Sequence, residues 1–454
     1  MTLRIHDTAT RQTVPFEPID PSHIRMYVCG PTVYDRIHIG NARPAVIFDV
    51  LYRLLKRLYP RVTYVRNITD VDDKINARAA ERGIAIRDLT EGTAAAYRDD
   101  TKAMGCLPPD VEPRATEHIA EMQEIISRLI ALGHAYEADG HVLFSVPSWK
   151  HYGAFARKDR DEQIAGARVD VASYKRDPAD FVLWKPSDGN TPGWDSPWGY
   201  GRPGWHIECS AMSEKHLGQD FDIHGGGLDL IFPHHQNEIA QSCCANPGST
   251  FAKYWMHNGY LLSEGEKMSK SLGNFYTVAE LLEEAPGEAL RLILLKTHYR
   301  APLDFTKAKL VEAKTELDRF YRALDGVPVV AAGEAALVPM LAALEDDLNT
   351  PAAMAVLHES LNAVNIASEA DKPAAVARLK AQADLLGLLQ QDPKSWFQGG
   401  ADVDAGRIEA LIAERLAAKK AKDFARADAI RAELLADGVV LEDKPGGVTE
   451  WRRA

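Results

Sequence analysis

The residues best suited to chemistry on a phosphate lie in two segments far apart in the sequence. One runs His38-Ile-Gly-Asn41, and the other runs Lys267-Met-Ser-Lys-Ser271 in a loop rich in glycine and glutamate. Histidine and asparagine can donate hydrogen bonds to a phosphate whose charge grows in a transition state, while Gly40 would let the backbone approach a nucleotide closely. Lysines flanked by small polar residues could neutralise the negative charge of a departing pyrophosphate. Each segment alone also fits a helix cap or a solvated loop; together they predict an ATP-consuming site.

A second group of residues offers ligands for a borderline-soft metal ion. His234 and Glu238 are four residues apart, so on a helix both would project from one face. Cys209 precedes them, and Cys29 ends a β-prone segment just before the histidine segment. Two thiolates, an imidazole and a carboxylate form a set that suits Zn²⁺. Spacing alone leaves rival ligands open, namely His206, His224, His235, Cys243 and Cys244.

The third group is a basic run near the end of the chain. Between positions 415 and 431 six basic residues accompany two acidic ones, although the whole chain has a formal net charge of −12. A local positive bias of this kind suits a phosphate backbone, and a solvated helical face is the alternative. The six residues are Arg415, Lys419, Lys420, Lys422, Arg426 and Arg431.

Length and composition set the broad class of protein. A chain of 454 residues is too long for one core and predicts two to four domains. The sequence has no apolar run long enough to cross a membrane and no signal-like N-terminus, so we expect a cytoplasmic protein. Its five scattered cysteines argue against a disulfide framework and favour roles as metal ligands, nucleophiles or buried apolar residues.

The elements that must position these residues indicate a parallel sheet. A β-prone segment at 24–28, helical periodicity over 42–58 and a β-rich run at 62–65 predict one right-handed strand–helix–strand unit. Strand signals resume at 220–224 and 253–257. The His38 segment would then lie at the carboxyl edge of a parallel sheet and at a helix N-terminus, where such folds bind anions.

We therefore predict an α/β protein. Its Rossmann-like parallel-sheet catalytic domain carries an inserted domain and is followed by an all-α helical bundle and a small α+β C-terminal unit. The predicted boundaries are 1–132 and 205–262 for the two halves of the catalytic domain, 133–204 for the insertion, 263–304 for the Lys-Met-Ser-Lys-Ser loop and connecting helices, 305–389 for the bundle, 390–406 for a linker and 407–454 for the last unit.

Long strings in the same order along nearly the whole chain resemble one family, the cysteinyl-tRNA synthetases, a class I branch of the aminoacyl-tRNA synthetases. Besides the Lys-Met-Ser-Lys-Ser loop, the strings span Tyr27–Asp35, Tyr64–Lys74, Gly166–Asp170, Arg202–Met212, Phe221–Asp229 and Phe232–Gln241. Asn41 departs from the family, whose His-Ile-Gly-His signature ends in histidine. The asparagine amide can still donate to a phosphate, so we expect activity to survive.

The resemblance implies a role for specific residues. It selects Cys29, Cys209, His234 and Glu238 as the ligands of one zinc ion per chain. It implies an ATP site, with Mg²⁺ accompanying the nucleotide, formed by His38, Gly40, Asn41, Asp229, Lys267 and Lys270, of which His38, Asn41 and the two lysines are catalytic. It implies an amino-acid pocket of Cys29, Gly30, Thr69, Trp205 and His224. The basic run and Trp451 would contact tRNA.

The implied activity is the ligation of cysteine to tRNA. L-Cysteine would be activated with ATP to cysteinyl-adenylate and transferred to the 3′-terminal adenosine of cysteine tRNA, by an enzyme that we expect to be monomeric and away from membranes. The alternative is an ATP-dependent ligase that joins cysteine to a small amine; such an enzyme has no reason to carry the basic C-terminal unit. A zinc hydrolase is less compatible, because catalytic zinc usually has three protein ligands and a water.

Overall fold

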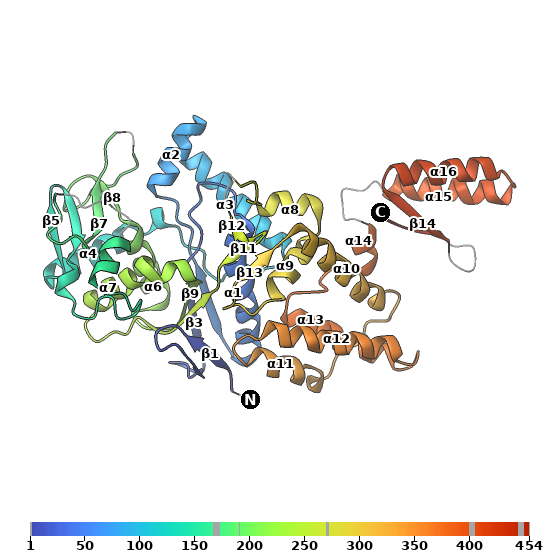
Figure 1. Cartoon of the computed structure of the whole chain (residues 1–454), viewed down its shortest axis with the longest axis horizontal. Coiled ribbons are helices and arrows are strands. Elements are labelled where there is room, and N and C mark those ends of the chain that lie inside the picture. Colours follow the sequence, from blue (N-terminus) through green and yellow to red (C-terminus); the bar gives the residue numbers. More distant parts are fainter. Residues whose placement is uncertain are drawn as a thin grey trace.

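The centre of the protein is a four-stranded parallel sheet with the strand order β10-β9-β3-β4. The computed structural model describes residues 2–166, 173–189, 191–268, 272–398, 405–443 and 449–453. The strands are β3 (Ile24–Val28), β4 (Val62–Arg66), β9 (Phe221–Gly227) and β10 (Ala252–Asn258). Because β3 pairs directly with β9, the two halves of the sheet join across the insertion, and the predicted parallel α/β sheet is confirmed (Figure 1).

Helix α1 (Ile39–Leu58) crosses from β3 to β4 and carries the histidine segment at its start. It begins three residues before the periodic apolar run, because the His38 side chain caps it by accepting a hydrogen bond from the Gly40 backbone N–H. Its long apolar face, including Val46, Leu51 and Leu55, is fully buried in the main core.

After β4, and before the predicted insertion, the chain forms α2 (Asp73–Arg82), α3 (Ile86–Ala103), the short η1 (Ala115–Glu117) and α4 (Ile119–Ala131).

The insertion contains more regular structure than its composition suggests, including an antiparallel sheet. The sheet has the order β5-β6-β7-β8, with strands Ala135–Ala138, His141–Phe144, Phe181–Pro186 and Gly201–Pro203, and η2 (Val146–Ser148) and α5 (Arg160–Gly166) lie between β6 and β7. The Gly-, Pro- and Trp-rich stretch thus supplies two strands, β7 and β8.

Two helices that flank β9 carry two of the four candidate zinc ligands, Cys209 and Glu238. Helix α6 (Trp205–Leu217) precedes β9, and α7 (Gln236–Ala245) follows it. Between β9 and α7 the chain forms the short η3 (Leu228–Leu230) and a π-helical turn, η4 (Ile231–His235). The chain that carries His234 is therefore irregular just before α7, with Phe232 outside helical geometry.

The remainder of the catalytic body and the bundle are mainly helical, as predicted. A small sheet, β12-β11-β13, is formed by Glu266–Lys267, Leu261–Ser263 and Leu303–Phe305, and the hairpin of β1 (Arg4–Asp7) and β2 (Gln12–Pro15) packs at the N-terminal end. The helices are α8 (Val278–Glu284), α9 (Gly287–Leu295), α10 (Lys307–Leu324), η5 (Glu334–Leu337), α11 (Val338–Leu344), α12 (Thr350–Ile366) and α13 (Lys372–Leu385). Thr277 caps α8 in a capping box with Glu280.

The end of the chain forms a separate small unit, seen at the right of Figure 1. It consists of α15 (Ala405–Lys420), α16 (Phe424–Ala436), β14 (Val439–Asp443) and β15 (Thr449–Arg453). The final polar stretch is a strand, since Trp451 packs into the core of this unit. The predicted linker also contains α14 (Pro393–Gln398), whose buried Trp396 stacks on Tyr321 with ring centroids 4.3 Å apart.

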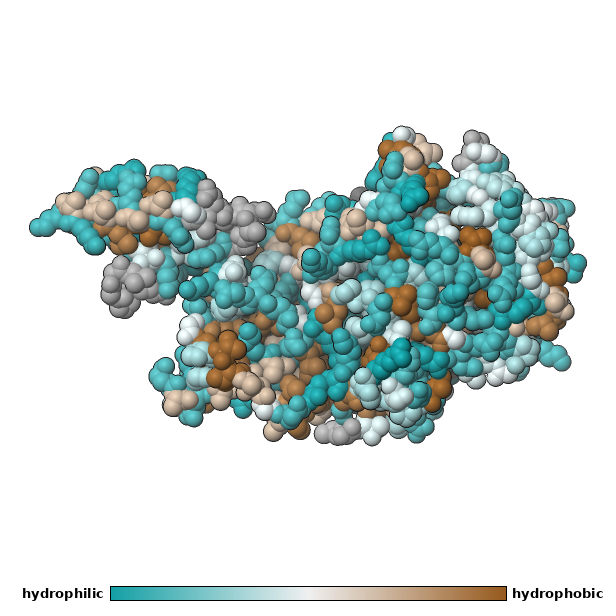
Figure 2. Space-filling view, turned by 180° about the vertical axis from the view of Figure 1, so that it is seen from behind, coloured by the Kyte–Doolittle hydropathy of each residue, from teal (hydrophilic) through white to brown (hydrophobic). Residues whose placement is uncertain are grey.

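The face of the protein seen from behind is mainly hydrophilic, with hydrophobic residues in small separate groups (Figure 2). Among the described residues, no helix combines the length and apolar character needed to cross a membrane.

Candidate functional site

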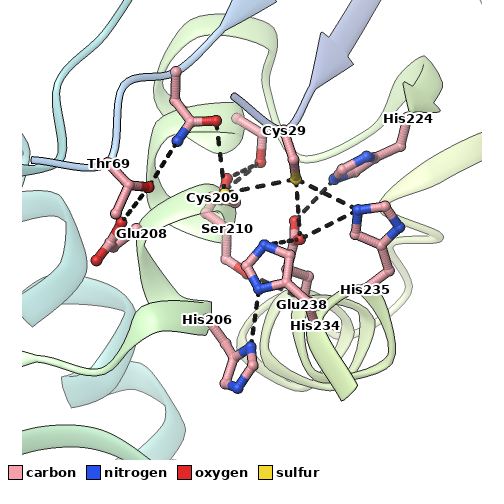
Figure 3. Close-up of polar contacts among 12 residues, drawn as sticks. Cys29, Thr69, His206, Glu208, Cys209, Ser210, His224, His234, His235 and Glu238 are labelled. Carbon is pink, nitrogen blue, oxygen red and sulfur yellow. Dashed lines mark hydrogen bonds and ion pairs between the residues drawn. The ribbon is translucent and has the colours of Figure 1, made fainter. Parts of the chain in front are cut away.

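Four potential metal ligands from separate parts of the chain meet beside the parallel sheet. Cys29 follows β3, Cys209 lies in α6, His234 in η4 and Glu238 in the first turn of α7. Cys29 Sγ lies 3.8 Å from Cys209 Sγ and 3.6 Å from Glu238 Oε1, and His234 Nε2 lies 3.0 Å from the same carboxylate oxygen. The four ligand atoms all lie within 4.8 Å of one another (Figure 3). The structure therefore brings together the set that the resemblance selects.

A second possible set overlaps the first. Cys29, His224, His235 and Glu238 also fall within 4.8 Å of one another, with His235 Nε2 at 3.4 Å from Cys29 Sγ. His224 Nε2 lies 2.8 Å from Glu238 Oε2, the oxygen that faces away from His234. Geometry alone thus leaves two quartets that share Cys29 and Glu238. The other rivals, Cys243 and Cys244, belong to neither quartet.

The surroundings of the two quartets favour the first. His234 Nδ1 lies 2.9 Å from His206 Nδ1, which fixes the ring and leaves Nε2 directed at the cluster. The first quartet also supplies two soft thiol donors, whereas the second supplies one. If the first quartet binds the metal, His224 is a hydrogen-bond partner of Glu238 outside the ligand set, and ligating carboxylates commonly have such a partner.

Local electrostatics prepare the cluster to receive a cation. Burial opposes charge on Glu238, but His224 and His234 nevertheless lower the pKa of this carboxyl to about 2. The hydrogen bond from Cys29 lowers the pKa of the Cys209 thiol to about 6, against the effect of burial. Burial raises the pKa of Cys29 well above its usual range. The site therefore presents a thiolate and a carboxylate at neutral pH, and these two groups raise the pKa of His234 to about 10 against the effect of burial. A metal ion would displace the His234 proton on binding.

The histidine segment forms the N-terminus of α1 in a defined protonation state. His38 Nδ1 accepts the Gly40 N–H at 3.1 Å, so its proton resides on Nε2, which remains available as a donor. Burial lowers the pKa of His38 to about 4, although the nearby Asp229 carboxylate acts in the opposite direction. The Asn41 and Asp229 side chains are exposed at the same end of the sheet, where they can reach a ligand.

The histidine segment lies beside Met268 and beside the residues that follow the lysine segment. Ile39 N donates to Tyr276 O at 3.1 Å, and Val278 N donates to Ile37 O at 3.0 Å, which joins the start of α1 to residues just beyond the lysine loop. A Cβ atom at Gly40 would lie 2.8 Å from Met268 Cε, so the Met268 side chain packs directly over the start of α1. The backbone of Lys267 belongs to β12, while Lys270 lies outside the described residues.

The residues expected in the amino-acid pocket adjoin the metal cluster. Trp205 stacks on His234, with ring centroids 4.2 Å apart. Gly30 approaches the chain so closely that a Cβ there would lie 1.7 Å from the backbone oxygen of Asn67. Thr69 is buried and donates to Glu208 at 2.9 Å. Sequence reasoning missed Asn67 and Glu208 because a buried polar residue inside a long matching string gives no periodic signal of its own.

The expected tRNA-contacting residues fall into two groups. Arg415 is buried and donates with two nitrogens to Asp443, and Trp451 is a core residue of its unit, so neither presents its side chain to a partner. Arginine in such a bidentate pair and tryptophan in a core stabilise the unit instead. Lys419 pairs with Asp443, and Arg426 pairs with Glu414. Lys420 ends α15, Arg431 lies on α16, and Lys422 lies in the loop between these two helices.

Three protein-family models match successive parts of the chain. Residues 15–315 match the class I (C) catalytic domain of the tRNA synthetases, residues 341–390 match the DALR domain, and residues 405–452 match the cysteinyl-tRNA ligase anticodon binding domain. The cysteine–tRNA ligase of Rhodospirillum rubrum is 62% identical, with 100% of each chain covered. That of Acidiphilium cryptum is 61% identical over 100% of this chain and 99% of its own.

Solved structures share the fold at low sequence identity. Methionyl-tRNA synthetase of Mycobacterium tuberculosis, solved with methionyl-adenylate, is 16% identical with a TM-score of 0.55 and covers 86% of this chain and 94% of its own. The leucyl-tRNA synthetase of Agrobacterium radiobacter K84, in a ternary complex, is 11% identical with a TM-score of 0.59 and covers 84% and 85%. The chain has the class I fold and belongs to the cysteine–tRNA ligase family of aminoacyl-tRNA synthetases.

Proposed function

We propose that this cysteine–tRNA ligase forms cysteinyl-adenylate at the junction of its two phosphate segments and selects cysteine through a zinc ion held beside them. The observation that carries this proposal is the cluster of Cys29, Cys209, His234 and Glu238 at the same sheet edge as the His38 helix N-terminus, in which Cys29 is half-buried and the other three are buried. The position of Cys29, directly between β3 and the histidine segment, links the thiol-binding and nucleotide-binding parts of the site.

The donor set fits zinc. Two sulfurs, one imidazole nitrogen and one carboxylate oxygen are borderline-soft donors, and the outer partners His206 and His224 orient two of them. When bound, zinc would supply a soft Lewis acid that favours a substrate thiolate over an alcohol, which stays protonated. A pocket relying on shape would reject serine only by about 10–100-fold, so this preference accounts for discrimination without an editing domain.

The protein's own groups supply positioning and charge stabilisation for adenylate formation. The cysteine carboxylate attacks the α-phosphorus of ATP, and pyrophosphate, accompanied by Mg²⁺, leaves towards Lys267 and Lys270. The neutral His38 donates from Nε2 to the phosphate, assisted by Asn41 and the N-terminus of α1. Gly40 keeps the backbone close to the nucleotide, and Asp229 faces its ribose. Little covalent work is required of the protein.

The acceptor is proposed to be the 3′-terminal adenosine of cysteine tRNA. The match of residues 405–452 to an anticodon binding domain supports a tRNA acceptor over a small amine, as do the lysines of α15 and the loop that follows it. We further propose that the enzyme is a cytoplasmic monomer. Its five cysteines are free thiols, as expected in a reducing compartment.

The proposal is tested by cysteine-dependent ATP–pyrophosphate exchange followed by transfer to purified cysteine tRNA. Exchange together with transfer is the expected result. Exchange without transfer would favour the small-amine ligase, and the absence of exchange would refute both ligase functions.

A further inference from the structure

Arg43, near the start of helix α1, is fully buried, and the proposed mechanism does not use it. Its guanidinium donates to four backbone carbonyl oxygens. Nη1 lies 2.7 Å from Gly259 O and 2.9 Å from Tyr260 O, while Nη2 lies 3.2 Å from His298 O and 2.8 Å from Ala301 O. Burial lowers the pKa of this guanidinium to about 10, so it stays charged at neutral pH and keeps all four terminal N–H groups.

The four carbonyls belong to two segments that lead into the small sheet of the lysine segment. Residues 259–260 precede β11, whose antiparallel partner β12 contains the first residue of the lysine segment. Residues 298–301 precede β13, the parallel partner of β11. The two segments meet directly, since Gly259 N donates to Tyr299 O at 2.7 Å. Arg43 thus binds the starts of two of the three strands in a sheet that lies against α1 (Figure 1).

The chain beyond the lysine segment returns to the same end of α1. Ile39 N donates to Tyr276 O at 3.1 Å, and Val278 N donates to Ile37 O at 3.0 Å. The lysine segment is therefore attached to the start of α1 on both sides, by backbone hydrogen bonds after it and by the Arg43 side chain before it. The attachment before the segment is the one that a single substitution can remove.

The shape of a guanidinium suits this contact better than its charge does. Its two terminal nitrogens lie in one plane and carry two N–H groups each, so they can bind carbonyls of two segments at once. A lysine ammonium would place three donors on a single nitrogen and reach fewer of these oxygens. All four partners of Arg43 are neutral backbone groups, so the position requires the planar fork.

We propose that Arg43 is a positioning residue for adenylate formation, which fixes the lysine segment relative to His38 so that both can act on the phosphates of ATP. The inference rests on the proposed function, in which Lys267 and Lys270 neutralise the departing pyrophosphate. Stabilisation of developing charge requires groups that are in place before the reaction, and a displacement of about 1 Å can cost about 100-fold in rate. A misplaced lysine segment should therefore lower kcat and leave the KM for cysteine almost unchanged.

The first test is pyrophosphate exchange by the full-length, zinc-loaded enzyme. Arg43→Met removes all four contacts and should lower kcat by about 10–100-fold, with the KM for cysteine within about threefold of the unaltered value. Arg43→Lys keeps the charge but reaches fewer carbonyls, so it should lower kcat by a smaller factor of about 3–10; it serves if Arg43→Met does not fold. Arg53→Met is the matched control on the same helix, because Arg53 donates to Gly105 O at 2.8 Å and contacts neither segment of the small sheet; it should change neither constant. An equal loss of kcat in Arg53→Met, or a loss confined to the KM for cysteine in the Arg43 variants, would overturn the inference.

A double-mutant cycle separates positioning from general damage to the fold. In an enzyme that already carries Lys267→Ala and Lys270→Ala, a displaced segment has no lysine left to misplace. Adding Arg43→Met there should lower the single-turnover rate of adenylate formation by less than about threefold. The same factor of loss in both backgrounds would show that Arg43 acts independently of the lysines and would overturn the inference alone. Full activity of the enzyme without the two lysines would instead refute their proposed role, and the inference with it.

Gly259→Ala approaches the same contact from the other side. A Cβ at Gly259 would lie 2.6 Å from Ala301 O, so the substitution separates the two segments that Arg43 joins. It should reproduce the loss of kcat with an unchanged KM for cysteine, and full kcat in this variant would contradict the inference.

Discussion

At the scale of single residues, the two carboxylate oxygens of Glu238 have different partners, and this difference organises the site. Oε1 faces Cys29 and His234, while Oε2 accepts from His224, so one carboxylate joins the metal quartet to an outer histidine. The i, i+4 spacing of His234 and Glu238 could be recognised from the sequence, and the resemblance selected the thiols. The hydrogen-bond partners that set the direction of each ring could not be predicted, because they come from segments far apart in the chain.

The choice between the overlapping quartets leads to a paired prediction. Cys209→Ala should lose nearly all bound zinc, since it removes one of two soft ligands, whereas His235→Ala should keep close to one zinc per chain. Zinc stoichiometry after dialysis, measured by atomic emission, distinguishes the two. Retention of zinc by Cys209→Ala together with its loss from His235→Ala would assign the metal to the quartet containing His224.

The protonation state of His38 leads to a prediction for stability. Unfolded histidine binds a proton below about pH 6.5, but burial lowers the folded pKa of His38 to about 4. Between these values the unfolded state binds more protons, so stability is greatest above pH 6.5 and falls as the pH drops towards 4. His38→Asn keeps a capping side chain and should remove about 1–3 kcal/mol of this fall. Urea unfolding at pH 7.5 and 4.5 measures the difference; identical pH dependence in both proteins would be the contrary result.

At the scale of elements, the sequence predicted the regular parts well. The strand–helix–strand unit follows from the apolar periodicity over 42–58 and its β-prone flanks, and the helical bundle lies within the predicted segment. Three features escaped prediction because tertiary contacts decide them. They are the π-helical turn η4, the short helix α14 held by Trp396, and the last strand β15 held by Trp451.

A buried ion pair fixes the helices that carry the site to the bundle. Arg291 of α9 pairs with Asp49 of α1 and donates to Leu386 O at the end of α13. Arg291→Met should lower the free energy of unfolding by about 1–3 kcal/mol, because the buried Asp49 loses one of its two arginine partners and keeps Arg53 at 2.9 Å. Arg57→Ala, which breaks the exposed α1 pair with Glu334, is the control and should cost less than about 1 kcal/mol. Denaturant unfolding would contradict the prediction if the two costs were equal.

At the scale of the whole molecule, the sheet domain and the C-terminal unit perform separable tasks. Adenylate formation involves the catalytic body, whereas the last unit contacts tRNA in the proposed function. Lys420→Glu combined with Lys422→Glu should raise the KM for tRNA and reduce its salt dependence, with pyrophosphate exchange unchanged. Lys56→Glu combined with Lys102→Glu, on exposed parts of α1 and α3, is the charge-matched control. A similar rise in the control would show that net charge alone is responsible.

The measurement that tests the central claim most directly is the ratio of kcat/KM for cysteine to that for serine, taken in pyrophosphate exchange with zinc-loaded and zinc-stripped enzyme. Removal of zinc should reduce the ratio to about 10–100, the range that shape alone supports, and adding zinc back should restore it. An equal ratio with and without zinc would contradict the account, because selection would then not depend on the cluster of Cys29, Cys209, His234 and Glu238.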